Sequence, residues 1–332
     1  MMSNPYLTSF SAQYTTPSTT VPKTVYVYDP LNRVVKVINP DSTNKTVVYD
    51  HWNVSLTDER GKKKDFFTDA YGNVVSVFEY LSGDFYRTNY EYDVAGQLVN
   101  VTNSMGNSLN FSYDNQGRKI KEIDPDKGTW NYTYDSVGNL IKQVDNRIVN
   151  ISYTYDQLNR KEKEIVNEGS INYTYDSFVL NTLSKVDIVN FSINFSYDSR
   201  LRKIGEETFI DGKRFIINYS YDSADRITSV VLPNGKAVIL TYDSQGLVSN
   251  ISNVTDIVYN ENNNPIIINY TNALKTNYTY NNSNFRLTEI ETVGKQDLDY
   301  LYDASANVLE INDSTNNINY SMTYDDLNRL TD

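Results

Sequence analysis

"INYTYDSF", residues 171–178, recurs along the chain in close variants: "WNYTYDSVGN" begins at Trp130, "NFSYDNQGR" at Asn110 and "INYSYDSAD" at Ile217. Each variant contains a Tyr-Asp pair and, in the same few residues, an Asn-x-Ser/Thr sequon. Self-similarity at a nearly fixed interval marks a repeat architecture, which has to be recognised before local structure is interpreted. The sequence therefore predicts a tandem array in which one short unit decides the fold.

The array contains fifteen copies of the unit, mostly 20 to 22 residues apart, and two copies carry Tyr-Asn in place of Tyr-Asp. One copy is the degenerate "TDAYGN" from Thr68. The other fourteen carry the ladder tyrosines, which are Tyr28, Tyr49, Tyr92, Tyr113, Tyr134, Tyr155, Tyr175, Tyr197, Tyr221, Tyr242, Tyr259, Tyr280, Tyr302 and Tyr324. Residues 24–332 are thus predicted to be a repeat array that ends in a half repeat. Residues 1–23, rich in Ser, Thr and Pro, are expected to form a flexible leader or connecting arm.

Each copy is predicted to be a β-hairpin. The Tyr-Asp pair is followed by a turn of the form Asp-x-x-Gly or Asp-x-x-Asn and then by an aliphatic segment, as in "GRKIKEI" from Gly117 and "GNLIKQV" from Gly138. Gly and Asn tolerate positive φ, and Asp bonds to the amides that follow it, so this step reverses the chain. A second turn signal, such as "DPDKG" from Asp124, closes the unit. Fifteen copies give about thirty short strands, each paired with its sequence neighbours in one long antiparallel ribbon.

The period of two along a strand gives each copy two different faces. In "NYTYD", Tyr132 and Tyr134 point to one side, whereas Asn131 and Thr133 point to the other. Stacked copies therefore build a tyrosine ladder on one face and a polar ladder on the other. Aromatic neighbours across strands contribute roughly 0.2 to 1 kcal/mol each, so the ladder is interpreted as a scaffold. The other interpretation is that the tyrosines bind a ligand such as a glycan.

Composition agrees with an all-β chain and excludes several kinds of site. The 29 Tyr and 12 Phe favour strands, the 42 Asn favour tight turns, and hydrophobic content of 39% is ample for a folded core. The absence of Cys excludes disulfides and thiolate metal sites. The single histidine, His51, lies at a turn of a repeat, and "DPDKG" lacks the remaining ligands of a calcium loop. No catalytic, cofactor-binding or metal residue is predicted, and we expect a non-enzymatic protein without a cofactor.

Charge narrows the range of partners. A net charge of −12 and a pI near 4.7 disfavour nucleic acid and anionic membrane surfaces, which attract clustered Lys and Arg. The one basic run, "RGKKK" at 60–64, is followed at once by Asp65 and is interpreted as a solvated turn. No apolar run approaches the roughly 18 to 20 residues that span a bilayer, so membrane insertion is not expected.

With these repeats the chain resembles the Rhs or YD-repeat family. The resemblance covers residues 25–332 and is most specific in "VYDPLNRVVKVINPDSTNKTVVYDHWNVSLTDERGKKKDFFTDAYGNVVSV", residues 27–77. It implies a continuous, curled or spiralling sheet that forms a hollow shell, which in many members encloses a C-terminal toxin. Related repeats occur in cell-surface adhesion proteins. The autoproteolysis segment and effector domain that usually follow the repeats in Rhs toxins are not recognisable here, since the sequence stops at "MTYDDLNRLTD".

Seventeen sequons are the second conspicuous pattern, more than the copied motif alone accounts for. They begin at Asn44, Asn53, Asn100, Asn110, Asn131, Asn150, Asn172, Asn190, Asn194, Asn218, Asn250, Asn253, Asn269, Asn277, Asn281, Asn312 and Asn319. We expect N-glycans on the polar face, which requires a secretory or archaeal surface pathway and hence an extracellular or cell-surface location. The other interpretation is that Asn and Thr simply suit a solvated strand face. No signal peptide is visible in the first residues.

The expected function is therefore that of an extracellular structural repeat protein, a glycosylated scaffold of the cell surface. The half repeat at 324–332 leaves a strand edge unpaired. We expect either the strand at 23–29 of another copy to complete it, giving a head-to-tail filament, or the rest of a longer chain to do so as part of a larger shell. The alternatives are a fragment of an Rhs-type shell around a C-terminal toxin and a surface adhesin that binds glycans or proteins.

Overall fold

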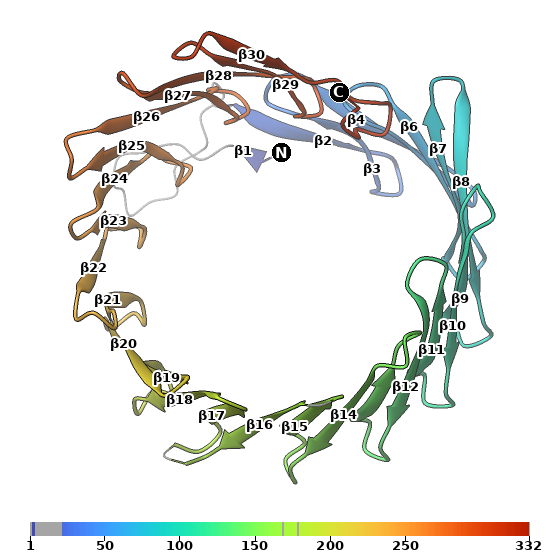
Figure 1. Ribbon diagram of the computed structural model, residues 1–332. Helices are drawn as coiled ribbons and strands as arrows, with labels where there is room; N and C mark the ends of the chain where they lie inside the picture. The colour runs from blue at the N-terminus through green and yellow to red at the C-terminus, as the bar shows by residue number, and fades with distance from the viewer. Residues whose placement is uncertain (1, 4–21, 168, 178, 332) are drawn as a thin grey trace. The chain divides into compact units, whose positions relative to one another are not determined.

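The computed structural model describes residues 2–3, 22–167, 169–177 and 179–331. It contains 30 β-strands and, among the described residues, no helix (Figure 1). The strand pairings are antiparallel and join neighbours in the sequence. The prediction of an all-β fold made of hairpin repeats is confirmed. Most of the predicted leader at 1–23 lies outside the described residues.

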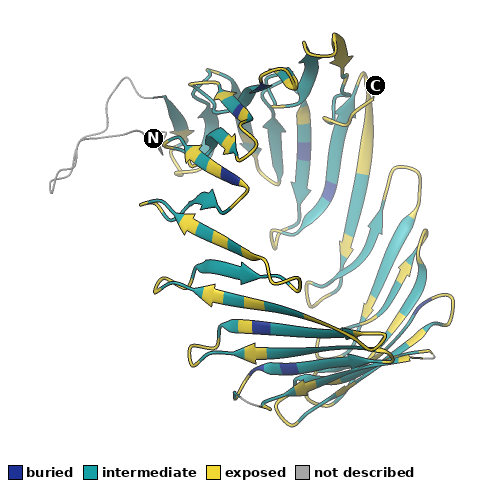
Figure 2. Cartoon of the chain, turned by 60° about the vertical axis from the view of Figure 1, so that its left-hand side comes forward, coloured by how far each residue is buried: buried dark blue, intermediate teal, exposed yellow. Residues whose placement is uncertain are grey.

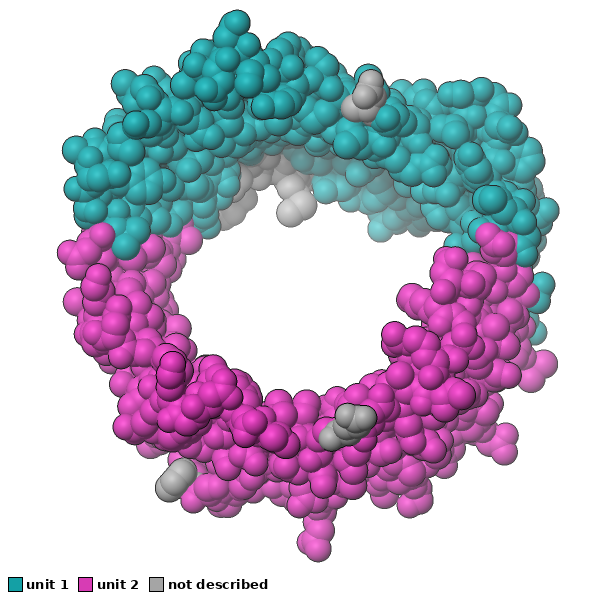
Figure 3. Space-filling view, in the orientation of Figure 1, with its two compact units in different colours: residues 1–91, 102–106, 254–332 teal, residues 92–101, 107–253 magenta. Residues whose placement is uncertain are grey.

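The chain divides into two compact units, which Figure 3 shows in different colours. Unit 1 consists of residues 1–91, 102–106 and 254–332, and unit 2 of residues 92–101 and 107–253. The strands wholly or mainly in unit 1 are β1 (Met2–Ser3), β2 (Lys23–Tyr28), β3 (Val34–Ile38), β4 (Asn44–Asp50), β5 (Asn53–Thr57), β6 (Lys63–Thr68), β7 (Val74–Leu81), β8 (Asp84–Tyr92), β24 (Thr255–Tyr259), β25 (Pro265–Tyr270), β26 (Lys275–Tyr280), β27 (Leu287–Thr292), β28 (Gln296–Tyr302), β29 (Val308–Asp313) and β30 (Ile318–Ser321). Those of unit 2 are β9 (Leu98–Thr102), β10 (Ser108–Tyr113), β11 (Lys119–Asp124), β12 (Gly128–Tyr134), β13 (Leu140–Val144), β14 (Asn150–Tyr155), β15 (Lys161–Val166), β16 (Gly169–Tyr175), β17 (Leu183–Ile188), β18 (Phe191–Tyr197), β19 (Lys203–Ile210), β20 (Lys213–Tyr221), β21 (Ile227–Val231), β22 (Ala237–Tyr242) and β23 (Val248–Ile251).

A β-bulge lies beside the ladder tyrosine of most copies. Between β12 and β13, Thr133 pairs with Lys142 and Tyr134 with Leu140, so that Ile141 has no partner. The same shift of register recurs in the other hairpins of this kind, among them β2–β3, β10–β11, β14–β15, β16–β17, β18–β19, β20–β21 and β26–β27. A bulge bends the strand and increases its twist. The sequence pattern gave no sign of it, because the extra residue differs from copy to copy, being Ile141, Glu162 or Thr288 for example.

The predicted turns have the predicted backbone. The third residue after the turn aspartate has positive φ, 101° at Gly138 and 59° at Asn159. Gly and Asn adopt this left-handed conformation at little cost. Leu201 (φ 64°) and Ala306 (φ 73°) occupy the same place without that advantage, which shows that the turn geometry is imposed by the surrounding hairpin.

Stability does not come from an apolar centre. Among the described residues no hydrophobic side chain is fully buried, although the composition provides enough hydrophobic residues for a core. Most positions are half-buried (Figure 2), because each side chain is covered by its neighbours on adjacent strands. The buried side chains of the described residues are polar or charged, namely Asp65, Ser76, Asp145, Thr182, Ser184, Thr255, Thr276 and Thr292. Cohesion is therefore distributed over strand-to-strand contacts, as in other repeat arrays.

Candidate functional site

The turn aspartate organises each copy. In the turn that begins at Asp156, Oδ1 accepts hydrogen bonds from the backbone N–H groups of Leu158 and Arg160, both at 2.9 Å, and Oδ2 accepts one from Nε of Arg160 at 2.7 Å. One carboxylate thus holds three donors and fixes the chain reversal. The same pair of backbone bonds is made by Asp29, Asp69, Asp93, Asp114, Asp135, Asp198, Asp222, Asp243 and Asp325.

The residue four positions after the turn aspartate, where it is arginine, joins its copy to the next; we name it the turn arginine. Nη1 of Arg118 donates to the backbone carbonyl of Asp135 at 2.9 Å, and the guanidinium carbon lies 4.9 Å from the ring centre of Tyr134. Arg202 makes the same two contacts with Asp222 at 3.0 Å and Tyr221 at 4.8 Å. A cation over an aromatic face is attractive, and a planar guanidinium can stack and donate at once. The turn arginine is therefore a link between consecutive copies.

The ladder tyrosine bonds backwards to the preceding copy. The hydroxyl of Tyr134 donates to the backbone carbonyl of Lys119 at 2.9 Å. The same bond joins Tyr49 to Val34, Tyr113 to Leu98, Tyr155 to Leu140, Tyr175 to Lys161, Tyr197 to Leu183, Tyr221 to Lys203, Tyr242 to Ile227 and Tyr280 to Pro265. Phenylalanine could supply the ring but not this donor, which gives a physical reason for the choice of tyrosine.

The remaining ladder tyrosines differ in their surroundings. Tyr28 begins the array and is half exposed, at 49%. Tyr302 lies against the guanidinium of Arg286, 5.8 Å from carbon to ring centre. Tyr92, Tyr259 and Tyr324 are half-buried at the same place in their copies.

We expect Tyr134→Phe to lower the free energy of unfolding by about 0.5 to 1.5 kcal/mol, because it removes one hydroxyl donor and leaves the Lys119 carbonyl without it. The matched control is Tyr132→Phe in the same strand, since the Tyr132 hydroxyl makes no hydrogen bond to any described residue. Urea unfolding of the two variants separates them. Equal losses from both would show that the hydroxyl bond is not what distinguishes the ladder position.

In the middle of unit 2, every second copy contains a half-buried Lys–Glu ion pair whose lysine lies against aromatic rings. Lys161 pairs with Glu164 at 2.8 Å, and its Nζ lies 5.2 Å from the ring centres of both Tyr153 and Tyr173. The hydrogen bond to Glu164 raises the pKa of Lys161 above its ordinary value. Lys119 with Glu122 and Lys203 with Glu206 repeat the arrangement. The lysine is thus held between aromatic rings of consecutive copies.

Hydrogen bonding holds the turn carboxylates in their charged form. For Asp156 the backbone N–H of Arg160 is the main cause that lowers the pKa below its usual 3.8, and for Asp198 it is the side chain of Arg202. The pKa of Asp222 is lowered in the same way. Donors that bond to a carboxylate stabilise its ionised form, so each of these turns is tightest when its aspartate is charged.

Acid is therefore expected to loosen the array at many turns together. The folded pKa values lie below the unfolded value near 3.8, so the turns contribute their full stability above that value and lose it as the pH falls through the folded values. Melting temperatures measured by circular dichroism should be flat from about pH 7 to 5 and fall steeply below about pH 4. A decline that is already complete above about pH 5 would assign the effect to other groups.

The predicted sequons fall into two sets. The exposed asparagines are Asn131, Asn150, Asn190, Asn218, Asn253, Asn269, Asn281 and Asn319. The half-buried ones are Asn44, Asn53, Asn100, Asn110, Asn172, Asn194, Asn250, Asn277 and Asn312. Oδ1 of Asn53 is buried without a hydrogen-bond partner in the described part of the chain, and the Asn319 amide donates to Glu310 at 2.7 Å. In β12, Asn131 and Thr133 are exposed while Tyr132 between them is half-buried.

Arg60 has a role that the sequence pattern did not reveal. From the turn between β5 and β6, its Nη1 donates to the backbone carbonyl of Asp325 at 3.1 Å and to Oδ1 of Asn328 at 2.8 Å, and its Nε lies 3.4 Å from Oδ2 of Asp303. The side chain is only 19% exposed. Asn307 stands where the turn arginine of that copy would stand and donates to Asn328 at 2.8 Å, and Arg60 supplies the bond to the Asp325 carbonyl that a turn arginine would make. The interpretation of "RGKKK" as a plain solvated turn is therefore wrong for its first residue.

Neighbouring side chains extend this contact within unit 1. Lys62 pairs with Asp326 at 2.7 Å, and the backbone N–H of Ser82 donates to the same carboxylate at 2.7 Å. Further along, the Asn284 amide donates to Asp41 at 2.9 Å. Segments from the two ends of the repeat array are thus held together by polar contacts that local sequence patterns cannot foresee.

Asp65 is a buried acid that is held by three side-chain donors. It is 3% exposed and accepts hydrogen bonds from Ser55 Oγ at 2.5 Å, from the Tyr80 hydroxyl at 2.6 Å and from Lys63 Nζ at 2.9 Å. Burial raises the pKa of this carboxyl, but the three donors outweigh burial and the net pKa is lowered. The acid therefore stays charged and ties β5, β6 and β7 together.

The single histidine and the acidic side chains form no candidate metal centre in the described part of the structure. His51 is an exposed turn residue whose Nδ1 lies 2.6 Å from a carboxylate oxygen of Asp50. No group of three or more His, Cys, Asp or Glu side chains among the described residues could hold a metal ion. Those residues also include no helix with the length and apolarity of a membrane span.

Two family models match the sequence. The Teneurin YD-shell model matches residues 161–256 and the RHS Repeat model residues 92–129, both made of the hairpins described above. These matches support an assignment to the Rhs/YD-repeat family. The resemblance inferred from the repeats is thereby confirmed, and among curated proteins no sequence matches.

Solved structures share the fold of this YD-repeat protein. The crystal structure of TcdB2-TccC3-Cdc42 aligns with a TM-score of 0.83 at 16% identity, over 92% of this chain and 19% of that one. The structure of a Photorhabdus luminescens Tc holotoxin pore aligns with a TM-score of 0.82, at 16% identity and the same coverage. This chain thus spans about a fifth of the length of the proteins it matches. At such low identity the likeness concerns the fold.

Proposed function

We propose that this YD-repeat protein is a non-enzymatic structural protein that works outside the cell as a segment of a shell-like wall. The observation that carries the proposal is the use of the repeated polar side chains: the turn arginine, the turn aspartate and the ladder tyrosine all bond within their copy or to a neighbouring copy. A family whose repeats serve in shells, and a fold shared with Tc toxin components, support a structural role. Electron microscopy of the purified protein tests this proposal and should show a regular wall or an assembled particle.

An outward strand edge supports assembly with further strands. β30 is exposed along its length, and the bridge between Tyr324 and Leu330 starts one more strand. We propose that this edge pairs either with the strand at 23–29 of another copy, head to tail, or with another strand of a larger shell. In this last hairpin the backbone N–H of Thr331 donates to the backbone carbonyl of Thr323 at 2.9 Å, which is the inward direction. Because successive N–H groups of a strand point to opposite sides, the N–H of Leu330 is directed outward, to the open edge.

Leu330→Pro tests the edge, because it removes that outward donor and spares the inward bond. Light scattering after size-exclusion chromatography should show assemblies for the parent protein and monomers for the variant. Val94→Pro, at an exposed turn position away from the edge that is equivalent to the chain's own Pro30, is the matched control and should assemble like the parent. A parent protein that is monomeric and compact at all concentrations contradicts self-assembly.

We further propose that the exposed sequons carry N-glycans and that the protein is located at the cell surface. The exposure of Asn131, Asn150, Asn218 and Asn269 on the face opposite the tyrosines supports this. Intact mass of protein from its natural source, before and after enzymatic deglycosylation, tests it. An unchanged mass contradicts the glycan proposal while leaving the structural role intact.

A second candidate, a segment of an Rhs-type shell that encloses a toxin, is favoured by the fold shared with Tc toxin components. It predicts that the open reading frame of the gene continues into an effector domain. Sequencing across the locus decides between this role and that of a surface scaffold.

A further inference from the structure

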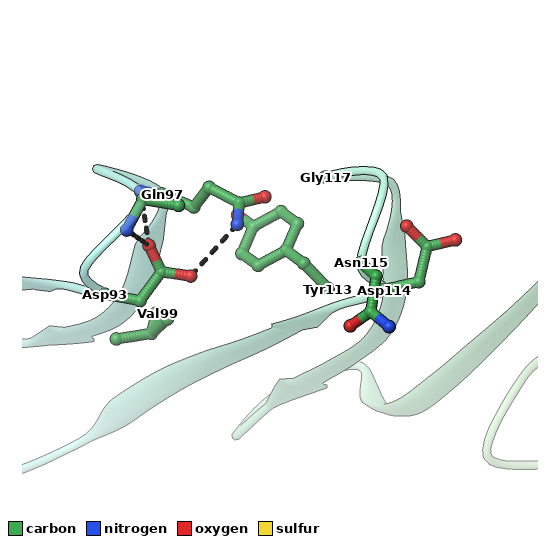
Figure 4. A pocket seen from close by; sticks show the side chains of 8 residues that line it. Asp93, Gln97, Val99, Tyr113, Asp114, Asn115 and Gly117 are labelled. Carbon is green, nitrogen blue, oxygen red and sulfur yellow. Dashed lines mark hydrogen bonds between the residues drawn. The ribbon is translucent and has the colours of Figure 1, made fainter.

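At one junction between copies in unit 2 a glutamine stands in place of the turn arginine, and no described residue makes the arginine's bond to the next turn. In the copy that begins at Asp93 the residue at that position is Gln97 (Figure 4). Its Nε2 donates to Oδ2 of Asp93 at 3.0 Å, as Nε of a turn arginine does, but the side chain ends there. The link that Arg118 makes to Asp135 in the following junction, at 2.9 Å, therefore has no counterpart. We name the gap between the turns at 93–97 and 114–118 the Gln97 junction.

The Gln97 junction is an open hollow of about 580 Å³. Its lining consists of Asp93, Ala95, Gln97, Val99, Tyr113, Asp114, Asn115 and Gly117. Oε1 of Gln97 is buried and has no hydrogen-bond partner among the described residues, and it is directed at the second turn, since a Cβ on Gly117 would lie 3.2 Å from it. A buried acceptor without a donor is costly, so the junction favours an occupant that donates hydrogen bonds.

The groups that a turn arginine uses elsewhere are present here. The backbone carbonyl of Asp114 accepts the N–H of Gly117 at 3.0 Å, as Asp135 accepts that of Gly138, and so retains a lone pair for the bond that Arg118 gives to Asp135. The ring of Tyr113 stands where Tyr134 stands under Arg118. Carbonyl, carboxylate, amide oxygen and ring together match a planar cation with several donors.

Unit 1 shows what happens to another copy that lacks its arginine. There Asn307 replaces the turn arginine, and Arg60, distant in the sequence, donates to the Asp325 carbonyl and lies near the Asp303 carboxylate. Such a gap in this fold accepts an arginine side chain from another segment. Asn139 and Asn307 each also reach the next turn, donating to Asn159 at 3.0 Å and to Asn328 at 2.8 Å, whereas Gln97 makes no such bond to a described residue.

We propose that the Gln97 junction binds the guanidinium group of an arginine side chain on a partner polypeptide. The guanidinium stacks on Tyr113 and donates to the Asp114 carbonyl and to Oε1 of Gln97. Lysine is a poor substitute, because its ammonium lacks the planar fork that reaches two acceptors while stacking. The net charge of −12 attracts a basic partner and so speeds its approach.

The test uses the whole chain with methyl-labelled Ala and Val, because Ala95 and Val99 line the hollow. A blocked Gly-Arg-Gly peptide is expected to shift both methyl signals saturably, and the Gly-Lys-Gly peptide to bind at least about tenfold more weakly. Gln97→Arg fills the junction and should abolish the shifts. No saturable shift, or equal binding of the lysine peptide, overturns the proposal.

Two further variants keep the test decisive. Asn139→Arg changes a junction that is already bridged and should leave peptide binding at the Gln97 junction unchanged. Gln97→Leu imitates the chain's own Leu247, which stands at the equivalent place after Asp243 and keeps its backbone bond at 2.9 Å, so the variant should fold. It removes the acceptor and should weaken peptide binding by about tenfold, the loss of one charged hydrogen bond. Unchanged binding in Gln97→Leu or persistent shifts in Gln97→Arg contradict the site.

Discussion

Replacing Asp65 by alanine is expected to lower the free energy of unfolding by roughly 2 to 4 kcal/mol. The carboxylate is almost completely buried and accepts bonds from Ser55, Lys63 and Tyr80. Alanine leaves the hydroxyls of Ser55 and Tyr80 without their acceptor and the Lys63 ammonium without its counter-ion. The figure stays below the loss usual for a fully buried pair, because the Lys63 side chain is half exposed and can turn to water.

Asp187→Ala is the matched control. Lys185 and Asp187 have the same spacing as Lys63 and Asp65 and an ion pair of 2.7 Å, but both side chains are 40% or more exposed. Its removal should change the free energy of unfolding by no more than about 0.5 kcal/mol. Urea unfolding followed by circular dichroism measures both. If the two variants are equally stable, burial does not set the contribution of Asp65.

The contrast between these two pairs shows what a sequence pattern reveals and what it does not. The repeats, the hairpins and the turns were predictable, because each depends on residues a few positions apart: Asp156 bonds to amides two and four residues later, and period two sets the faces of a strand. Burial of Asp65 depends on three strands at once. Nothing in Lys-x-Asp distinguishes it from the exposed pair in β17.

The details of the repeat were also only partly predictable. That tyrosine recurs was plain from the sequence, but the bulge beside Tyr134 and the hydroxyl bond to Lys119 depend on the register between strands. The residue four positions after the turn aspartate has a larger structural role than the repeat pattern suggested. Arginine there links copies; at Asn307 a link comes from Arg60 instead, and at Gln97 no described residue supplies it.

Arg60→Ala is expected to loosen the last copy of the array. Arg60 bonds to Asp325 and Asn328 and lies beside Asp303, so it holds two consecutive turns. Its loss leaves these acceptors without their donor, at roughly 1 to 3 kcal/mol, which corresponds to about 5- to 150-fold faster local opening. Hydrogen–deuterium exchange of the amides in 318–331 measures this directly, since local opening exposes them without global unfolding.

A second substitution separates this specific role from general disturbance. An arginine at position 307, introduced as Asn307→Arg in the Arg60→Ala background, can donate through Nε to Asp303 and through Nη1 to the Asp325 carbonyl, as Arg118 does to Asp114 at 2.7 Å and to Asp135 at 2.9 Å. It should restore slow exchange in 318–331. The control Arg200→Ala removes an exposed arginine of unit 2 and should leave that exchange unchanged. Fast exchange that persists in the double variant would mean that Arg60 does not stand in for a missing turn arginine. Unchanged exchange in Arg60→Ala alone would mean that Lys62 and Ser82 suffice to hold Asp326 and the turn it belongs to.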